Sequence, residues 1–397
     1  MITELTRTRI RAIDALRGLT ILVMVFVNQL AGVTGVPAWA RHMPAGADAM
    51  SFVDVVFPAF LFIVGMSIPF AFEQRLARGD DGAALQRHVL GRTLGLVVLG
   101  LFMVNAEEGF NPAFMPLPIA AWSLAFYACA WLVWGVYGAA APGGRNLWRS
   151  VGVLGLLALA DAWHGGPDGR GWMTHQWWGI LGLIGWSYLI AASAYLACRG
   201  RVAGLLAATA GCVAFFALGQ ALRDAPWPGL ADLLAERAMV CETSLTLLGC
   251  VTSLLFFGRP QGGPSRARRF GRAALLLAGL VVAGAALRPA YGISKIWGTP
   301  TWCLYSAAIC IVLFAALHWW VDLRGRSAWV RLVEPAAANP LVAYLIPFVI
   351  EALLDLLHLE LPPALAQGAS GVAFCVAYAL AVLGATALIG RRVRLQL

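Results

Sequence analysis

Residues 53–72 read VDVVFPAFLFIVGMSIPFAF and carry one charged side chain, Asp54. A run of about 20 apolar residues is what a helix needs to cross the hydrocarbon core of a bilayer. Comparable runs recur along the chain at residues 16–36, 53–72, 89–104, 117–140, 147–162, 177–198, 202–222, 240–258, 273–291, 301–321, 337–357 and 370–390. The pattern predicts an all-α fold, a polytopic membrane helix bundle of 11–12 transmembrane helices. Eleven is the alternative because two runs are short and residues 337–357 include Glu351 and Asp355.

The composition excludes a soluble protein. Of 397 residues, 60% are hydrophobic and 12% are charged, with a mean hydropathy of +0.76, whereas a soluble domain has about 25% charged residues. The formal charge of +9 comes from short basic clusters between apolar runs, which indicates membrane topology rather than nucleic acid binding. The eight cysteines show no C-x-x-C spacing, so no metal site is predicted.

The distribution of arginine predicts the orientation. With the N-terminus in the cytoplasm and twelve spans, 23 of the 29 Lys and Arg residues fall in cytoplasmic segments, as the positive-inside rule requires. Both termini are therefore expected in the cytoplasm. The first run could pass for a signal peptide, but Asp14, Arg17 and Asn28 within or beside it favour a retained helix. Loops are short, so we expect a single transmembrane domain over residues 1–397.

Several polar side chains mark the first two runs. Asp14 and Arg17 are three residues apart, so they share a helix face and can pair. Asn28 lies about 16 Å deeper along the same helix, where it faces either protein or a cavity. His42 and Asp54 follow at the outer mouth of the two helices. For Arg17, the alternative to a functional role is a structural ion pair. For Asn28, the alternative is an interhelical hydrogen bond.

Histidine is suited to take a proton near neutral pH or to accept an acyl group, and a carboxylate can fix its tautomer. His42 with Asp54 is therefore the candidate catalytic pair, although a single loop histidine can also be surface decoration. Farther along, Arg288 and Lys295 are positive charges on the outer side, against the general bias. Lys295 beside Trp297 is expected to steady an anionic group or a hydroxyl-rich ligand, unless these cations pair with an outer carboxylate such as Glu107 or Glu108.

These residues resemble a known family. The segments that carry the resemblance are Arg11-Ala-Ile-Asp14-Ala-Leu-Arg17-Gly18, Val25-Phe-Val-Asn28, His42, Asp54-Val-Val-Phe57-Pro58 and Phe60-Leu-Phe-Ile-Val-Gly65-Met66-Ser67. Over residues 11–72 this is similar to the membrane domain of heparan-alpha-glucosaminide N-acetyltransferase, and most similar to a NagX-like bacterial branch. Lys295-Ile-Trp297-Gly-Thr299 and Asn339-Pro340-Leu-Val-Ala-Tyr344 add weaker similarity.

The resemblance implies an acyltransferase of the bacterial inner membrane. It would move an acetyl group from cytoplasmic acetyl-CoA, the co-substrate, to the amine of a glucosamine-type sugar on the periplasmic side, without a metal. The expected catalytic residues are His42, Asn28 and Asp54, those that bind acetyl-CoA are Arg17, Asp14 and Arg92, and those that bind the sugar are Lys295, Trp297 and Asn339. A homodimer is left open. The alternative function is a transporter of amino sugars or muropeptides, which would use the same central polar residues as a path.

Overall fold

The regular structure of the molecule is helical throughout the part of the chain that is described. The computed structural model describes residues 10–137, 142–222, 229, 234–258, 265–390 and 395. Within these ranges the only strand-like features are isolated bridges such as Thr34 with Gln367. The expected all-α class is therefore confirmed.

Each of the twelve apolar runs forms a helix. The helices are α1 (Arg11–Leu30), α2 (Val56–Ala77), α3 (Gly82–Glu107), α4 (Ile119–Trp134), α5 (Pro142–Asp161), α6 (Gly179–Ala197), α7 (Val202–Ala221), α9 (Arg237–Phe257), α10 (Arg266–Tyr291), α11 (Pro300–Leu317), α12 (Val330–Ala338), α13 (Pro340–Leu356) and α14 (Gly368–Ile389). Short 3₁₀ turns cover Ala38–Ala40, Val53–Val55 and Pro363–Leu365, and a π-helical turn, His318–Leu323, continues α11.

Fewer of these helices can span a membrane than we expected. In the described ranges nine are long and apolar enough, and α12 with α13 would make a tenth span that bends by 82°. α4 has 16 residues, short of a full span, and α5 carries Arg145 and Arg149 in its first half. The polytopic bundle is thus confirmed. The expected 11–12 spans are more than the nine or ten found in the described ranges, because α4 is too short and α5 is too polar.

Glycines let the central helices pack closely. A Cβ atom on Gly65 of α2 would overlap the carbonyl oxygen of Thr246 on α9, and one on Gly249 would overlap the carbonyl oxygen of Phe62. Gly100 of α3 meets Gly182 of α6 in the same way. Small residues permit this backbone approach between membrane helices. Gly179 and Gly182 therefore allow α6 to approach α3 closely at Gly100.

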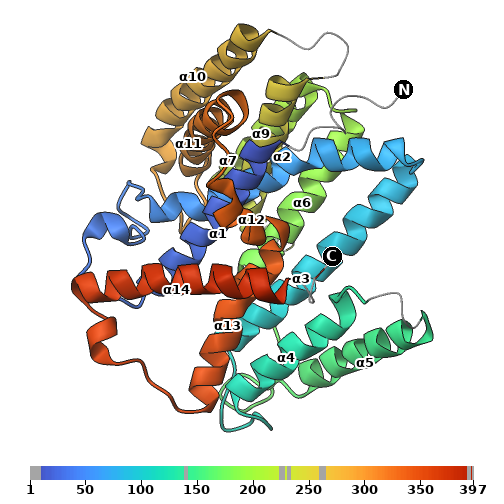
Figure 1. The fold of residues 1–397 in the computed structure, drawn as a ribbon, viewed down its shortest axis with the longest axis vertical. Helices are drawn as coiled ribbons and strands as arrows, with labels where there is room; N and C mark the ends of the chain where they lie inside the picture. Colours follow the sequence, from blue (N-terminus) through green and yellow to red (C-terminus); the bar gives the residue numbers. More distant parts are fainter. Residues whose placement is uncertain are drawn as a thin grey trace.

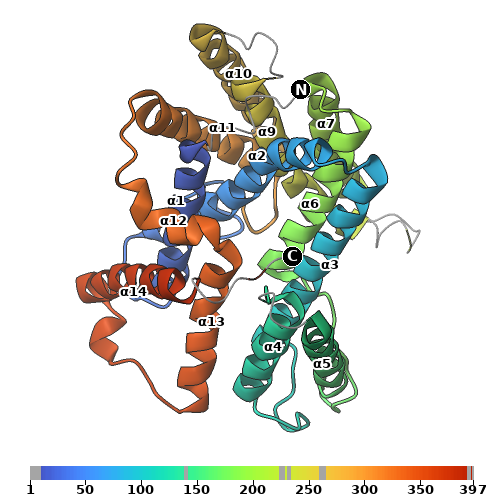
Figure 2. The same cartoon turned by 45° about the vertical axis from the view of Figure 1, so that its right-hand side comes forward.

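The arrangement places α1 at the centre (Figure 1). α1 contacts α2 on one side and α12, α13 and α14 on the other. α4 and α5 lie side by side at the lower end of the molecule, and α4 also contacts α3 and α13 (Figure 2). The break between α12 and α13 falls at Asn339, where the chain turns beside α1. Polar residues on α1, α3 and α13 are therefore brought to neighbouring positions.

Candidate functional site

His42 and Asp54 form a close polar pair at the start of α2. The 3₁₀ turn at Val53–Val55 sets Asp54 directly before α2. His42 Nδ1 lies 2.7 Å from Asp54 Oδ1, and the Asp54 carboxylate is 1% exposed. Its other oxygen, Oδ2, accepts hydrogen bonds from the N–H groups of Ser51 (2.9 Å) and Met43 (3.2 Å). The carboxylate is held from three directions, so it holds the imidazole through Nδ1.

Lys295 completes this cluster from a distant part of the sequence. Its Nζ atom lies 3.2 Å from His42 Nε2 and 3.3 Å from Nδ1. An ammonium nearly equidistant from both ring nitrogens does not lie on the axis of the Nε2 lone pair. Because Asp54 accepts the Nδ1 proton, that lone pair stays available, and the side chain of His42 is 40% exposed. A substrate can therefore reach Nε2.

The loop that carries Lys295 is anchored to the loop that carries His42. Arg288 at the end of α10 donates from Nε to Asp48 Oδ2 at 3.1 Å, and the N–H of Ile293 donates to Asp48 Oδ1 at 2.8 Å. The partner of Arg288 is thus Asp48 rather than Glu107 or Glu108. Trp302 Nε1 also donates to the carbonyl oxygen of Asp54, at 3.1 Å. These bonds join residues about 250 positions apart and hold Lys295 next to the imidazole of His42.

Burial lowers the pKa of Lys295, and the negative charges of Asp54 and Glu242 oppose that shift. Glu242 lies on α9, is 7% exposed, and its Oε2 atom has no hydrogen-bond partner in the described part of the chain. Sequence reasoning missed this residue. The available signal was a lone carboxylate in the apolar run at residues 240–258, since an ionisable residue within a membrane helix indicates function by default.

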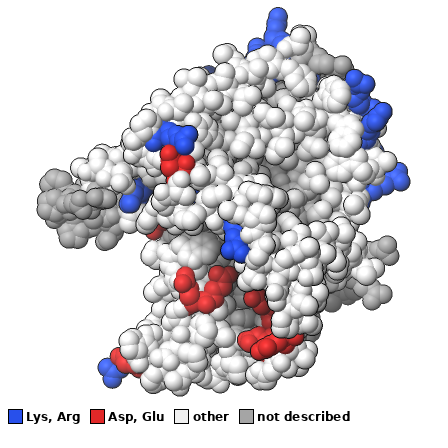
Figure 3. Space-filling view, turned by 90° about the vertical axis from the view of Figure 1, so that its left-hand side faces the viewer, with Lys and Arg blue, Asp and Glu red and all other residues white. Residues whose placement is uncertain are grey.

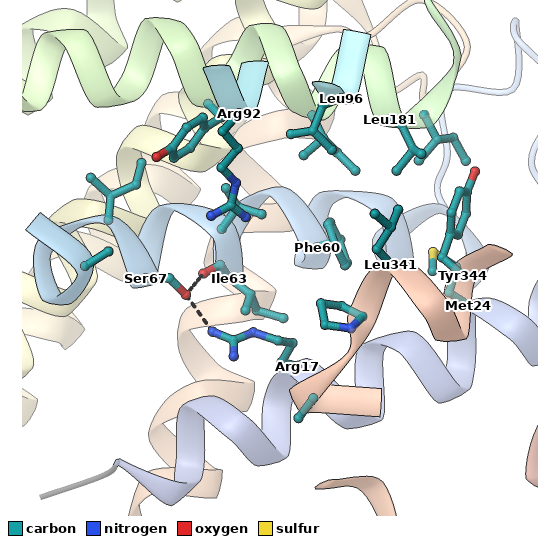
Figure 4. A pocket seen from close by; sticks show the side chains of 18 of the residues that line it. Arg17, Met24, Phe60, Ile63, Ser67, Arg92, Leu96, Leu181, Leu341 and Tyr344 are labelled. Carbon is teal, nitrogen blue, oxygen red and sulfur yellow. Dashed lines mark hydrogen bonds between the residues drawn. The ribbon is translucent and has the colours of Figure 1, made fainter. Parts of the chain in front are cut away.

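Arg17 and Arg92, which were expected to bind acetyl-CoA, line one pocket (Figure 4). It has a volume of about 330 Å³ and lies between α1, α2, α3, α6 and the α12–α13 break. Arg17 donates to Ser67 Oγ at 2.7 Å and lies 3.5 Å from Asp14, which confirms the expected pairing with Asp14. The Arg92 guanidinium lies 4.8 Å from the ring centre of Tyr188, and its buried Nε has no hydrogen-bond partner among the described residues.

A second, larger cavity contains Asn28. It has a volume of about 890 Å³ and adjoins the arginine pocket, because Ile180, Leu181 and Tyr344 line both. Its polar lining is acidic: Glu107, Glu351, Asp355 and Glu360. Figure 3 shows acidic side chains gathered in a hollow in the lower half of one face, apart from most basic side chains. The two cavities are therefore neighbours: one is lined by Arg17 and Arg92, and the other by a cluster of carboxylates.

The other expected site residues are dispersed. Trp297 is exposed beside Lys295, and its N–H donates to Ser294 Oγ at 3.4 Å. Asn339 lies at the α12–α13 break but is in the lining of neither cavity, because its side-chain amide lies against Gly390 at the end of α14; the structure brings it neither to Arg17 nor to Lys295. Asn28 lines the acidic cavity, whereas His42 is in the lining of neither cavity. No group of three metal-binding side chains occurs in the described ranges.

Comparison with known proteins gives one consistent result. Residues 9–113 match the family described as heparan-alpha-glucosaminide N-acetyltransferase, catalytic. The chain is also 32% identical over 105 residues to the heparan-alpha-glucosaminide N-acetyltransferases of Homo sapiens and Mus musculus. That alignment covers 26% of this chain and 15% of each relative. The matched residues 9–113 are thus similar to this family and include Arg17, Asn28, His42, Asp54 and Arg92; the bacterial branch is not identified by these matches.

Proposed function

We propose that the chain is a transmembrane N-acetyltransferase of the bacterial inner membrane. It takes the acetyl group of acetyl-CoA from the cytoplasmic side and transfers it to the amine of a glucosamine-type sugar on the periplasmic side. One observation carries this proposal: the arginine pocket and the Asn28 cavity share Ile180, Leu181 and Tyr344. A thioester that enters at the arginines can therefore extend to the opposite, acidic end within one passage.

The arginine pocket suits the nucleotide end of acetyl-CoA. Guanidinium groups bind phosphates through several donors at once, and Arg17 and Arg92 both line this pocket. Asp14 holds Arg17 in place by an ion pair of 3.5 Å. The apolar walls beyond the two arginines suit the thin pantetheine arm.

Asn28 is proposed to assist at the thioester. Its amide lines the acidic cavity on the far side of Tyr344 from the arginines. An N–H donor directed at the thioester oxygen stabilises the negative charge that develops there when the carbonyl carbon is attacked. The side chain of Asn28 is therefore assigned to the oxyanion, and Lys295 provides a positive charge near the imidazole.

His42 can act by two routes. In direct transfer, the sugar amine attacks the acetyl carbon, the bond to sulfur breaks, and Nε2 takes the amine proton and returns it to the departing thiolate. In the covalent route, Nε2 itself attacks the acetyl carbon, coenzyme A leaves, and the amine then attacks the acetyl-imidazole. Asp54 serves both routes because it accepts from Nδ1 at 2.7 Å and so directs the lone pair to Nε2.

Both routes require His42 and Asn28 to act on the same substrates. Asn28 is near the end of α1 and Asp54 directly precedes α2, so the two lie where the chain leaves and re-enters the bundle. The Arg41 guanidinium donates to the carbonyl oxygen of Val33 at 3.4 Å, which folds the connecting loop back toward α1. Trp297 beside Lys295 is proposed to contact the sugar. Asn339, which lies between α12 and α13, is proposed to act on the sugar site only indirectly, by setting the break beside the arginine pocket.

The test is a detergent-purified protein given acetyl-CoA and glucosamine. Release of free thiol together with N-acetylglucosamine supports the proposal, and glucose in place of glucosamine should release none. A single-turnover experiment separates the routes: acetyl label trapped on His42 before sugar is added indicates the covalent route. If no thiol is released with any amino sugar, the transferase function is wrong.

One feature favours the alternative, a transporter of amino sugars or muropeptides. The 82° break between α12 and α13 lies beside both cavities, and broken membrane helices commonly form substrate sites in transporters. Proteoliposome uptake decides between the two functions. Accumulation of unmodified glucosamine without thiol release would support the transporter, whereas product that appears only with acetyl-CoA would support the enzyme.

A further inference from the structure

Two carboxylates face the Asn28 cavity without a cation. Glu107 is the last residue of α3 and Glu351 lies on α13, and both line the cavity. They are close enough for their charges to interact. No ion pair recorded for the described residues involves either of them. Like charges in a cavity with largely apolar walls repel each other and lose hydration, so this pair is suited to a positively charged ligand.

Tyr344 is an independent sign of a ligand at the same place. Its side chain is 6% exposed, yet no hydrogen bond recorded for the described residues involves its hydroxyl group. The hydroxyl is not among the fully buried atoms without a partner in the described chain, so it reaches the cavity space, where a ligand can supply the hydrogen bond that a polar group normally makes. Tyr344 lines both cavities and, in the close view, projects from α13 toward the residues that line the passage (Figure 4). Its hydroxyl is therefore placed to bond to something that enters.

The remaining walls suit a ring that has apolar faces and polar edges. Trp177, Phe348, Phe374 and Tyr378 line the cavity together with the carboxylates. Aromatic faces pack against apolar surfaces and also attract cations. A volume of about 890 Å³ lies within the ordinary range for small-molecule sites. It leaves room for a monosaccharide beside an acyl-bearing arm.

We propose that this cavity binds the acceptor by its ammonium group, which Glu107 and Glu351 hold between them while Tyr344 bonds to a hydroxyl. The ligand class is a polyhydroxylated primary amine such as an amino sugar. This inference rests on the proposed function and assigns this cavity to the first binding of the acceptor; transfer then requires the amine to leave the carboxylates and meet His42, which lies outside the cavity lining. The two carboxylates should bind a sugar that carries an ammonium group more tightly than a neutral sugar, because only the ammonium group supplies a positive charge to pair with them.

The test measures glucosamine binding to the purified protein in detergent without acetyl-CoA. Glucose and N-acetylglucosamine, which lack the ammonium group, are the matched probes and should bind at least about tenfold more weakly. Glu107→Gln and Glu351→Gln should each weaken glucosamine binding by about tenfold or more, in line with the loss of a charged hydrogen bond. Tyr344→Phe should weaken it less. Glu108→Gln is the control, since Glu108 adjoins Glu107 in sequence but is outside the cavity lining.

The outcomes separate this site from the proposed function. Unchanged glucosamine affinity in both Glu→Gln variants, with acetyl-CoA binding intact as evidence of folding, would overturn the site even if the wild-type protein releases thiol. Failure of the wild-type protein to prefer glucosamine over glucose would also overturn it. Amine-selective binding that depends on Glu107 and Glu351, in a protein that releases no thiol, would keep the site and reject the transferase.

Discussion

Lys295 Nζ lies 3.2 Å from His42 Nε2, although 252 residues separate the two side chains in the chain. The contact exists because Asp48 binds both Arg288 and the N–H of Ile293, which joins the two loops. With Asp54 on the other ring nitrogen, the imidazole is held between an anion and a cation. A histidine held in this way is positioned for proton or acyl transfer.

Replacement of His42 by alanine should abolish acetyl transfer. The variant loses the only group here that can both accept the amine proton and carry the acetyl group, so thiol release should fall by about 10²–10⁴-fold. Binding of acetyl-CoA, measured by calorimetry, should stay within about twofold of wild type. His358→Asn is the control, because His358 is exposed and Asn tolerates its positive φ of 53°. Full activity of His42→Ala would remove the imidazole from the mechanism.

Replacement of Arg17 by alanine should act on the co-substrate instead. Arg17 lines the pocket proposed for the nucleotide, so its loss should raise the KM for acetyl-CoA by about tenfold or more with a smaller change in kcat. Arg78→Ala is the matched control, since Arg78 is an exposed arginine outside that pocket. A normal KM for acetyl-CoA in Arg17→Ala would place the nucleotide elsewhere.

Lys295 should titrate below its ordinary range. Burial disfavours the ammonium form and lowers its pKa from 10.5, so at a given pH more of the reactive free amine is present than in an exposed lysine. Lys295 is the only lysine in the chain, so an amine-directed acylating reagent reports on it and on the terminal amine alone. The modification rate of the Lys295 peptide, followed by mass spectrometry, should rise with pH to a midpoint below 10.5. A midpoint at or above 10.5 would contradict the prediction.

Replacement of Glu242 by glutamine should lower that midpoint further. The negative charge of Glu242 favours the charged form of Lys295 and so opposes the lowering of its pKa by burial. Removing that charge should therefore lower the pKa further. The same labelling experiment measures the effect. Glu236→Gln is the control, because Glu236 lies just before the same helix but pairs with His175 at 3.4 Å. An unchanged midpoint in Glu242→Gln would show that Glu242 does not act on Lys295.

The sequence predicted the local parts of the site and missed the part that depends on tertiary contacts. The pairing of Asp14 with Arg17 follows from helical spacing, and His42 with Asp54 from their place at one helix mouth. Arg17 and Arg92, which the sequence grouped as candidates to bind acetyl-CoA, line one pocket. Glu242 was missed because its role beside Lys295 depends on the α10–α11 loop folding over α9. Hydrophobic periodicity does not predict such a tertiary contact. Asn339 was grouped with Lys295, but at the α12–α13 break its side chain lies against Gly390 at the end of α14, outside both cavities.

For the fold, the apolar runs located every long helix. They could not show that α12 and α13 bend by 82°, or that α4 and α5 are too short or too polar to count as full spans. Length and hydropathy measure a helix in isolation. The bend falls at Asn339-Pro340, where the proline disfavours a helical backbone at the residue before it; its angle, with α12 packed against α1 and α14, is a property of the assembled bundle.

Replacement of Gly65 by alanine should destabilise the bundle where α2 crosses α9. A Cβ atom there would overlap the backbone carbonyl of Thr246, which cannot rotate away. Separating the two helices should cost about 1–3 kcal/mol, seen as a lower Tm in detergent by circular dichroism. Gly279→Ala is the matched control: Gly279 lies in the helix interior of α10, nothing lies within 4 Å of its added Cβ, and alanine is the better helix former there. The Gly279 variant should therefore melt at or above the wild-type temperature. Equal melting of the two variants would show that the α2–α9 crossing is not as close as the geometry indicates.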